Sequence, residues 1–148
     1  MIDGTGTCKE AGFIFYLQPK DLANSVIHSG DNTDGVGTGD DEKIIIDLDK
    51  VPADITRIAF TVTIYKPNSR HQNFGMVSNS YIRVLDADTQ NPLCRFDLGE
   101  DFSTQTAVVA GEIYKNNGEW KFKAVGEGYN GGLAELCRSF NLDVKSEE

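Results

Sequence analysis

Residues 106–125 read TAVVAGEIYKNNGEWKFKAV, and this stretch decides the fold class. Two runs rich in β-branched and aromatic residues flank Asn117-Gly118, and an Asn-Gly pair in that position is the strongest short-range sign of a β-hairpin. In the second run, apolar residues alternate with Lys121 and Lys123. Such alternation indicates a strand with one buried and one solvated face. We therefore predict an antiparallel hairpin here.

Other short strands are predicted upstream of this hairpin. Each is a short, mostly apolar run bounded by turn residues, which favours a strand over a helix. The first of them is predicted to be buried on both faces, and residues 66–78 are predicted to form a long irregular connection. The predicted strands are Phe13–Leu17, Ser25–His28, Lys43–Leu48, Ile58–Tyr65, Ser80–Leu85 and Leu93–Leu98.

Only the end of the chain has a helical pattern, in Gly132–Phe140, and residues 143–148 are a polar tail. Apolar residues at helical spacing would form one stripe along that helix. They are Leu133, Leu136, Cys137 and Phe140. Because strands dominate the rest, we predict a mainly β chain: a β-sandwich of two antiparallel-rich sheets with one short C-terminal helix.

Size and charge limit the classes of function. The chain has 148 residues and a formal net charge of −9. This length suits one domain with a sizeable core, so we expect a single domain over residues 1–148. The negative charge argues against nucleic acid or an anionic membrane surface as a partner, because both attract basic patches. We see no apolar run long enough to span a membrane.

Three cysteines, Cys8, Cys94 and Cys137, are scattered without the CxxC spacing of metal and redox motifs. Such cysteines fit reduced thiols in a cytoplasm better than a disulfide framework. We expect Cys94 and Cys137 to be buried. Cys8 follows a glycine-rich turn and is expected to react more readily.

Residues 29–42, SGDNTDGVGTGDDE, combine five carboxylates and four glycines with no basic residue. Two like charges 4 Å apart repel by about 1 kcal/mol in water and by roughly 4 kcal/mol near a protein surface. A cation is therefore expected among them, and Ca²⁺ suits oxygen ligands in adaptable geometry. Glycines would let backbone carbonyls turn inward. The carboxylates are Asp31, Asp34, Asp40, Asp41 and Glu42.

Two other interpretations of this segment were weighed. A run of glycine and aspartate also occurs in solvated connections between strands, because these residues favour turns. An EF-hand is excluded, although Glu42 is twelfth from Asp31, because Gly35 and Val36 stand where that motif needs an oxygen ligand and a glycine. A β-branched run follows the segment, whereas an EF-hand needs a helix.

We predict that the protein is not an enzyme. Its only histidines, His28 and His71, lie in no nucleophile-elbow, HExxH or Cys-His pattern. No Gly-Lys-Ser/Thr follows the glycines of the acidic segment, so it is not a P-loop. His28 is expected to be a structural ring within a strand. A histidine beside the metal would revive catalysis, and His71 is the candidate for that position.

Three segments carry a family resemblance. They read HSGDNTDGVGTGDDEKIIIDLDKVPADI from His28, HQNFGMVSNSYIRVLD from His71, and DLGEDFSTQTAVVAGEIYKNNGEWKFKAVGEGYNGGLAELC from Asp97. Together they resemble the TerD family of tellurite-resistance and chemical-stress proteins, across nearly the whole chain. The resemblance implies a Ca²⁺-binding β-sandwich, usually cytoplasmic, that acts as a binding or scaffolding part of stress assemblies without a settled enzymatic activity.

The same resemblance implies a set of metal ligands. Asp31 and Asn32 match the first acidic segment of the family signature, and Asp40, Asp41 and Glu42 match the second. These five residues are the predicted Ca²⁺ ligands.

The start of the chain departs from the family pattern. TerD-like domains typically begin with two or three strands carrying an Asp-Leu-Asp ligand segment, ahead of a stretch like FMIDGTG, whereas this sequence starts at MIDGTG. The domain is therefore expected to lack its N-terminal strands, which would expose a sheet edge and weaken calcium binding. Residues 47–49, also Asp-Leu-Asp, are not a substitute because they align with a strand end. Gln105 stands where the family often has glutamate.

The predicted function is that of a calcium-binding stress-response protein of the tellurite-resistance type, with protein partners in a stress assembly. The alternative is a Ca²⁺-dependent domain that binds a small molecule such as a nucleotide or sugar. Open coordination positions on the bound ion would favour the alternative, and a fully protein-ligated ion would favour the first.

Overall fold

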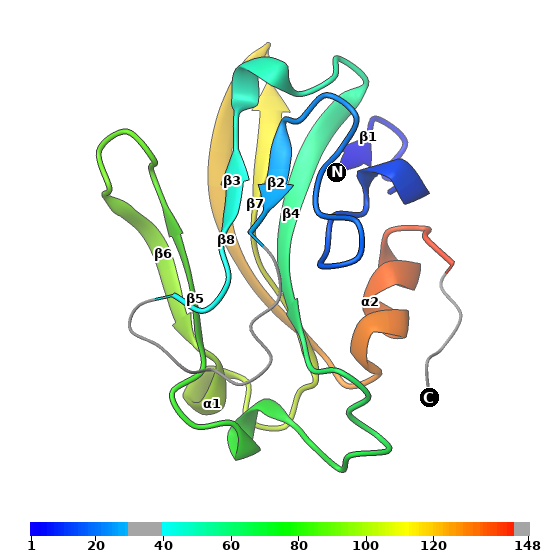
Figure 1. Cartoon of the computed structure of the whole chain (residues 1–148), viewed down its shortest axis with the longest axis vertical. Coiled ribbons are helices and arrows are strands. Elements are labelled where there is room, and N and C mark those ends of the chain that lie inside the picture. Colours follow the sequence, from blue (N-terminus) through cyan, green and yellow to red (C-terminus); the bar gives the residue numbers. More distant parts are fainter. Residues whose placement is uncertain (30–39, 144–148) are drawn as a thin grey trace. The chain divides into compact units, whose positions relative to one another are not determined.

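The computed structural model describes residues 1–29 and 40–143. The chain divides into two compact units, Met1–Thr56 and Arg57–Glu148. Figure 1 shows the elements of both.

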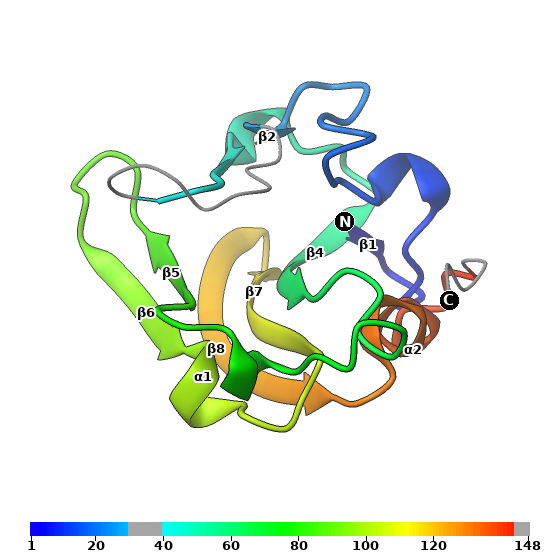
Figure 2. The same ribbon diagram turned by 60° about the horizontal axis from the view of Figure 1, so that its bottom comes forward.

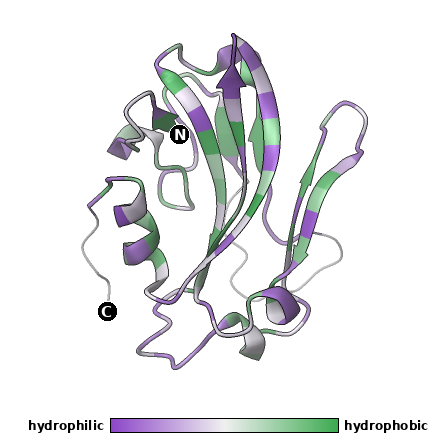
Figure 3. Cartoon of the chain, turned by 180° about the vertical axis from the view of Figure 1, so that it is seen from behind, coloured by the Kyte–Doolittle hydropathy of each residue, from purple (hydrophilic) through white to green (hydrophobic). Residues whose placement is uncertain are grey.

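The second unit is built on an antiparallel sheet in which β4, β7 and β8 are neighbours in that order. These strands are Ile55–Thr63, Ala107–Asn116 and Glu119–Tyr129. The tip between β7 and β8 has Asn117 at φ 52° and Gly118 at φ 79°. Positive φ at both central residues defines a type I′ turn, so the hairpin predicted from Asn-Gly is confirmed. Hydrophilic and hydrophobic bands alternate along the sheet in Figure 3.

A second antiparallel pair, β5 (Tyr81–Leu85) and β6 (Pro92–Asp97), packs on one face of this sheet. Two one-turn segments, η3 (Phe74–Met76) and α1 (Leu98–Asp101), contribute side chains to the layer between the β5–β6 pair and the sheet. The core of this layer consists of Phe74, Leu98, Phe102 and Val108, with Val62, Ile64, Ile82 and Phe96 packed around them. Two sheets therefore face each other across a hydrophobic layer, as a sandwich requires.

Helix α2 (Gly132–Ser139) covers the opposite face of the sheet, as Figures 1 and 2 show. Its Leu136 packs against Ala107 and Val109 of β7, whereas Val108 belongs to the other core. Alternate residues of β7 thus enter two cores, because successive strand side chains point to opposite faces. The predicted mainly β architecture, with antiparallel sheets and a short C-terminal helix, is confirmed. The four-residue helix α1 was not predicted; Asp97 caps it by accepting a hydrogen bond from Glu100 N at 3.1 Å.

The first unit contains only short elements. They are β1 (Ile2–Asp3), η1 (Glu10–Gly12), β2 (Val26–His28), β3 (Ile44–Ile46) and η2 (Leu48–Lys50). Strands β2 and β3 pair antiparallel, with Val26 opposite Ile46 and His28 opposite Ile44.

The strand predicted at Phe13–Leu17 is wrong. Phe15 and Gln18 exchange both backbone hydrogen bonds, at 3.1 and 3.0 Å, so the run folds into a tight turn. The Gln18 side-chain amide also donates to the carbonyls of Glu10 and Phe13, which removes two acceptors that a neighbouring strand could have used. Leu17 is 69% exposed. Nothing local in the sequence marks this apolar run as a turn.

The prediction for the cysteines is confirmed at Cys137 and wrong at Cys8 and Cys94. Cys8 and Cys137 are buried, and Cys94 on β6 is only half-buried. The glycine-rich turn before Cys8 suggested that this residue is exposed, but Cys8 itself is buried. This burial raises the pKa of its thiol.

We expect Cys94 to be the first cysteine modified by a maleimide in the native protein. Burial also raises the pKa of Cys94, but a half-buried thiol is reached by the reagent without unfolding. Mass spectrometry of partly labelled protein would identify the modified site. Cys8 and Cys137 should label only after denaturation, and faster labelling of Cys8 than of Cys94 would contradict the observed packing.

Candidate functional site

The acidic segment connects β2 to β3. Asp31 and Asn32, the first two predicted ligands, fall within residues 30–39 and so lie outside the described residues. Of the remaining three, Asp40 is half-buried, and Asp41 and Glu42 are exposed. The structure therefore places the last part of the predicted ligand set directly ahead of β3.

Backbone contacts hold the two ends of the segment together. Ser29 N donates to Lys43 O at 2.8 Å, and Lys43 N donates to Ser29 Oγ at 2.9 Å. The first bond continues the β2–β3 ladder by one residue beyond the pairing of His28 with Ile44, and the second is accepted by the Ser29 side chain. Two hydrogen bonds thus join Ser29 and Lys43, the residues on either side of residues 30–42.

His28 adds a side-chain contact next to these hydrogen bonds. Its Nε2 lies 3.3 Å from Glu42 Oε2, and the exposed fractions of the two side chains are 7% and 43%. Sequence reasoning had assigned His28 a structural role only and missed its contact with a predicted ligand. The signal that could have found it is the position of His28, directly before the loop that Glu42 ends.

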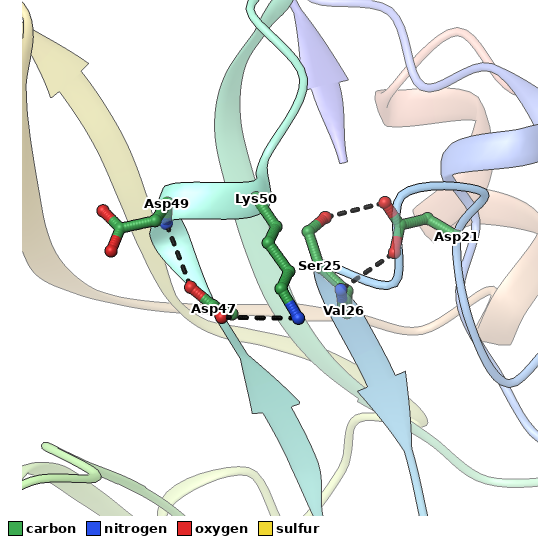
Figure 4. A network of polar contacts seen from close by, with 6 residues as sticks. All are labelled: Asp21, Ser25, Val26, Asp47, Asp49 and Lys50. Carbon is green, nitrogen blue, oxygen red and sulfur yellow. Dashed lines mark hydrogen bonds and ion pairs between the residues drawn. The ribbon is translucent and has the colours of Figure 1, made fainter.

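The opposite end of the β2–β3 pair is fixed by carboxylates acting as backbone acceptors (Figure 4). Asp21, which is buried, accepts hydrogen bonds from Ser25 Oγ at 2.7 Å and from Val26 N at 2.9 Å. Asp47 accepts from Asp49 N at 3.2 Å and lies 3.8 Å from Lys50 Nζ. Burial alone raises the pKa of Asp21, but the hydrogen bonds from Val26 and Ser25 outweigh it, and the pKa is lowered overall. This end of the strand pair is held by polar contacts within the chain.

Asp21→Ala is expected to lower the free energy of unfolding by about 2–3 kcal/mol at pH 7, since hydrogen bonds to a charged group contribute about 1.5–3 kcal/mol each. Because folding lowers the pKa of Asp21, its stabilisation is present above the unfolded pKa and is lost as pH falls through the folded value. Urea unfolding at pH 7 and at pH near 3 should therefore show a smaller difference between wild type and variant in acid. Asp21→Asn keeps one acceptor oxygen and should lose less, whereas equal losses at both pH values would contradict this assignment.

The described residues include three of the five predicted metal ligands, Asp40, Asp41 and Glu42. Among residues 1–29 and 40–143, no three His, Cys, Asp or Glu side chains gather in a group that could hold a metal ion. Asp40, Asp41 and Glu42 nevertheless offer consecutive carboxylates, which are the oxygen donors that Ca²⁺ takes. The donor chemistry fits a hard cation. His71 lies on an exposed turn with φ 52°.

A separate hollow of about 220 Å³ lies in the first unit, between the N-terminal turn and the segment before β4. Asp3, Asp21 and Asp54 are among the residues that line it, and the described ligand candidates 40–42 are not. Asp21 is engaged by Ser25 and Val26, and Asp3 accepts from Thr5 N and Oγ1 at 2.9 and 2.6 Å. Two of its three carboxylates, Asp3 and Asp21, are therefore already engaged by neighbouring residues, and the hollow is not part of the candidate site.

Comparison with known proteins identifies the family. Residues 1–140 match the TerD domain. The chain belongs to the TerD family. Among relatives, it is 55% identical over 132 residues to a chemical-damaging agent resistance protein B of Clostridium acetobutylicum, covering 89% of this chain and 95% of that protein. It is 49% identical over 135 residues to a tellurium resistance protein TerD of Alcaligenes sp, covering 91% and 70%.

A solved TerD homologue has the same fold. A homologue of telluride resistance protein (TerD) from Streptomyces coelicolor A3(2) superposes with a TM-score of 0.70 at 22% identity, covering 80% of this chain and 68% of that one. The domain match and the relatives named above confirm the family predicted from the sequence motifs. In the described part of this TerD-family chain, no helix is long and apolar enough to cross a membrane.

Proposed function

We propose that this TerD-family chain is a calcium-binding stress-response protein of the cytoplasm that acts as a binding or scaffolding module for protein partners, and not as an enzyme. Its relatives bear the names of tellurium and chemical-damage resistance proteins. The observation that carries the proposal is the position of three consecutive carboxylates, residues 40–42, directly before Lys43, which is hydrogen-bonded to Ser29 at the other end of the acidic segment.

The proposed ligands are oxygen donors from both ends of the loop: Asp31, Asn32, Asp40, Asp41 and Glu42. A bound Ca²⁺ would supply positive charge that cancels their mutual repulsion. The chain's contribution would be to supply the carboxylates of residues 40–42 directly ahead of β3. Once repulsion is cancelled, the loop can present a constant surface to a partner protein. The alternative prediction is that the ion links the protein to a small-molecule ligand.

The proposal predicts selective thermal stabilisation by calcium. A ligand that binds only the folded state adds RT ln(1 + [L]/Kd), about 2.7 kcal/mol at a hundredfold excess over Kd. Mg²⁺ should stabilise less, because it requires near-octahedral geometry and gives up its waters reluctantly. Melting curves in EDTA, Ca²⁺ and Mg²⁺ at equal ionic strength would measure both effects. Identical melting temperatures in Ca²⁺ and EDTA would refute the calcium proposal.

A further inference from the structure

Strand β8 is the last strand of its sheet, and only β7 pairs with it. The pair that closes their hairpin is Asn116 with Glu119. In a two-residue hairpin the closing pair exchanges hydrogen bonds, and the pairs beyond it alternate between hydrogen-bonded and not. Every second residue of β8 therefore directs its N–H and C=O away from β7. These residues are Trp120, Phe122 and Ala124.

The outer edge of β8 is open over the length of one strand. None of the described residues outside β7 forms a hydrogen bond with residues 119–125. Beyond them, Gly126 has φ 64° and lies against the ring of Phe96 on β6, which ends the regular edge. Strands typically have about 5–6 residues, so the open edge has room for one added strand. Unpaired backbone groups in such a row form a template for another chain.

The side chains along this edge carry an excess of positive charge. Lys121 and Lys123 are exposed on the same face of β8. Lys123 Nζ lies 3.0 Å from the buried carboxylate of Glu112, which Arg57 Nη1 also approaches at 3.5 Å, so two cations share one anion. Lys121 makes no ion pair with any described residue. The only carboxylate of the open edge on this face is Glu119, at the turn.

This charge pattern disfavours a second copy of the chain as the added strand. An antiparallel pairing of two copies centred on Phe122 would use the whole of residues 119–125. It would set Lys121 of one copy opposite Lys123 of the other, and directly opposed like charges destabilise a strand pair. Lysines on an edge strand guard against such self-pairing. A strand with carboxylates at the two opposing positions would be attracted instead.

We propose that residues 119–125 of β8 bind an extended acidic segment of a partner protein as an added β-strand, with its carboxylates opposite Lys121 and Lys123. Backbone hydrogen bonds along the edge would supply affinity, and the two lysines would supply selectivity. The inference rests on the proposed role as a binding module for protein partners and names the chemistry of that partner. It does not require calcium.

The first test uses a blocked seven-residue peptide of alternating valine and glutamate as the probe. Trp120 is the only tryptophan of the chain and lies on the open edge, so its fluorescence reports binding. We expect a saturable change that weakens at higher salt, because the lysines are exposed. The same peptide with lysine in place of glutamate should not bind. Equal responses to the two peptides would overturn the proposal.

Amide hydrogen exchange distinguishes an added strand from attraction by charge alone. The acidic peptide should slow exchange at Trp120, Phe122 and Ala124, whose amides would gain partners. Exchange at Lys121 and Lys123 should change little, because their amides already face β7. Binding without this alternating pattern would overturn the added strand.

Two variants test the charge and the backbone separately. Lys121→Glu should weaken peptide binding about fivefold, because a cross-strand attraction becomes a repulsion. Arg70→Glu, exposed in the same unit, changes net charge equally and should leave affinity unchanged. Ala124→Pro removes an outward N–H, a change that edge strands tolerate, and should weaken binding about tenfold, whereas Ala124→Thr should bind as wild type does.

Equal affinities of Lys121→Glu and Arg70→Glu would contradict the role of the edge lysines. If Ala124→Pro does not fold, the exchange pattern and Lys121→Glu decide the question. Sedimentation of the protein alone tests the other occupant: a dimer that Ala124→Pro dissociates would assign the edge to a second copy and overturn the proposal. A wild type that calcium stabilises but that binds no acidic peptide would overturn this inference alone. Peptide binding with identical melting in Ca²⁺ and EDTA would instead refute only the calcium proposal.

Discussion

Replacing Asp40 and Asp41 together by asparagine is expected to abolish the calcium-dependent stabilisation of the protein. Asparagine keeps an amide oxygen and nearly the same shape but removes two of the charges that attract the ion. At a hundredfold excess of calcium over the wild-type Kd, the lost stabilisation is about 2.7 kcal/mol. Urea unfolding in calcium and in EDTA would give the difference for each protein directly.

A control pair separates a local effect from a change in net charge. Asp88→Asn with Glu100→Gln removes two exposed carboxylates of the second unit and changes net charge by the same amount. This control should keep the full response to calcium. If the Asp40→Asn/Asp41→Asn protein responds to calcium as strongly as the control does, the ligands lie elsewhere.

Leu136→Ala is expected to lower the free energy of unfolding by about 3–5 kcal/mol. Leu136 is only 2% exposed and packs against Ala107 and Val109, so the deletion leaves a cavity between α2 and the sheet. Buried leucine-to-alanine changes combine a lost transfer free energy with a cavity cost, which gives this range. Urea unfolding monitored by circular dichroism would measure it.

Leu133→Ala is the matched control for that variant. Leu133 lies one turn earlier on α2 and is partly exposed, so the same chemical deletion should cost clearly less. Equal costs at the two positions would mean that α2 does not pack on the sheet through the stripe containing Leu136.

Local sequence signals predicted the elements whose structure is locally determined. The turn at Asn117-Gly118 could be located from the sequence, because an Asn-Gly pair readily adopts the positive φ that a type I′ turn requires. Helix α2 could be located because its apolar residues recur at helical spacing. The turn at Phe13–Leu17 could not be predicted, because it depends on hydrogen bonds to Gln18. No periodic pattern in the sequence marks Gln18 as their partner. Cys8 was misjudged because the glycine-rich turn before it does not determine the burial of the cysteine itself.

Part of the candidate site could likewise be predicted from the sequence, and part of it could not. The density of carboxylates in residues 29–42 and the family motifs both indicated a cation, and Asp40, Asp41 and Glu42 lie together ahead of β3. Asp31 and Asn32 stay predictions. The contact of His28 with Glu42 depends on strand register, because only the pairing of His28 with Ile44 brings the two side chains to the same end of the ladder.

Calorimetric titration of the metal-free protein with Ca²⁺, and separately with Mg²⁺, tests the central claim most directly. We predict saturable calcium binding that is clearly tighter than magnesium binding in wild type and absent in the Asp40→Asn/Asp41→Asn protein. Equal affinities for the two ions, or no heat of calcium binding in wild type, would contradict the account.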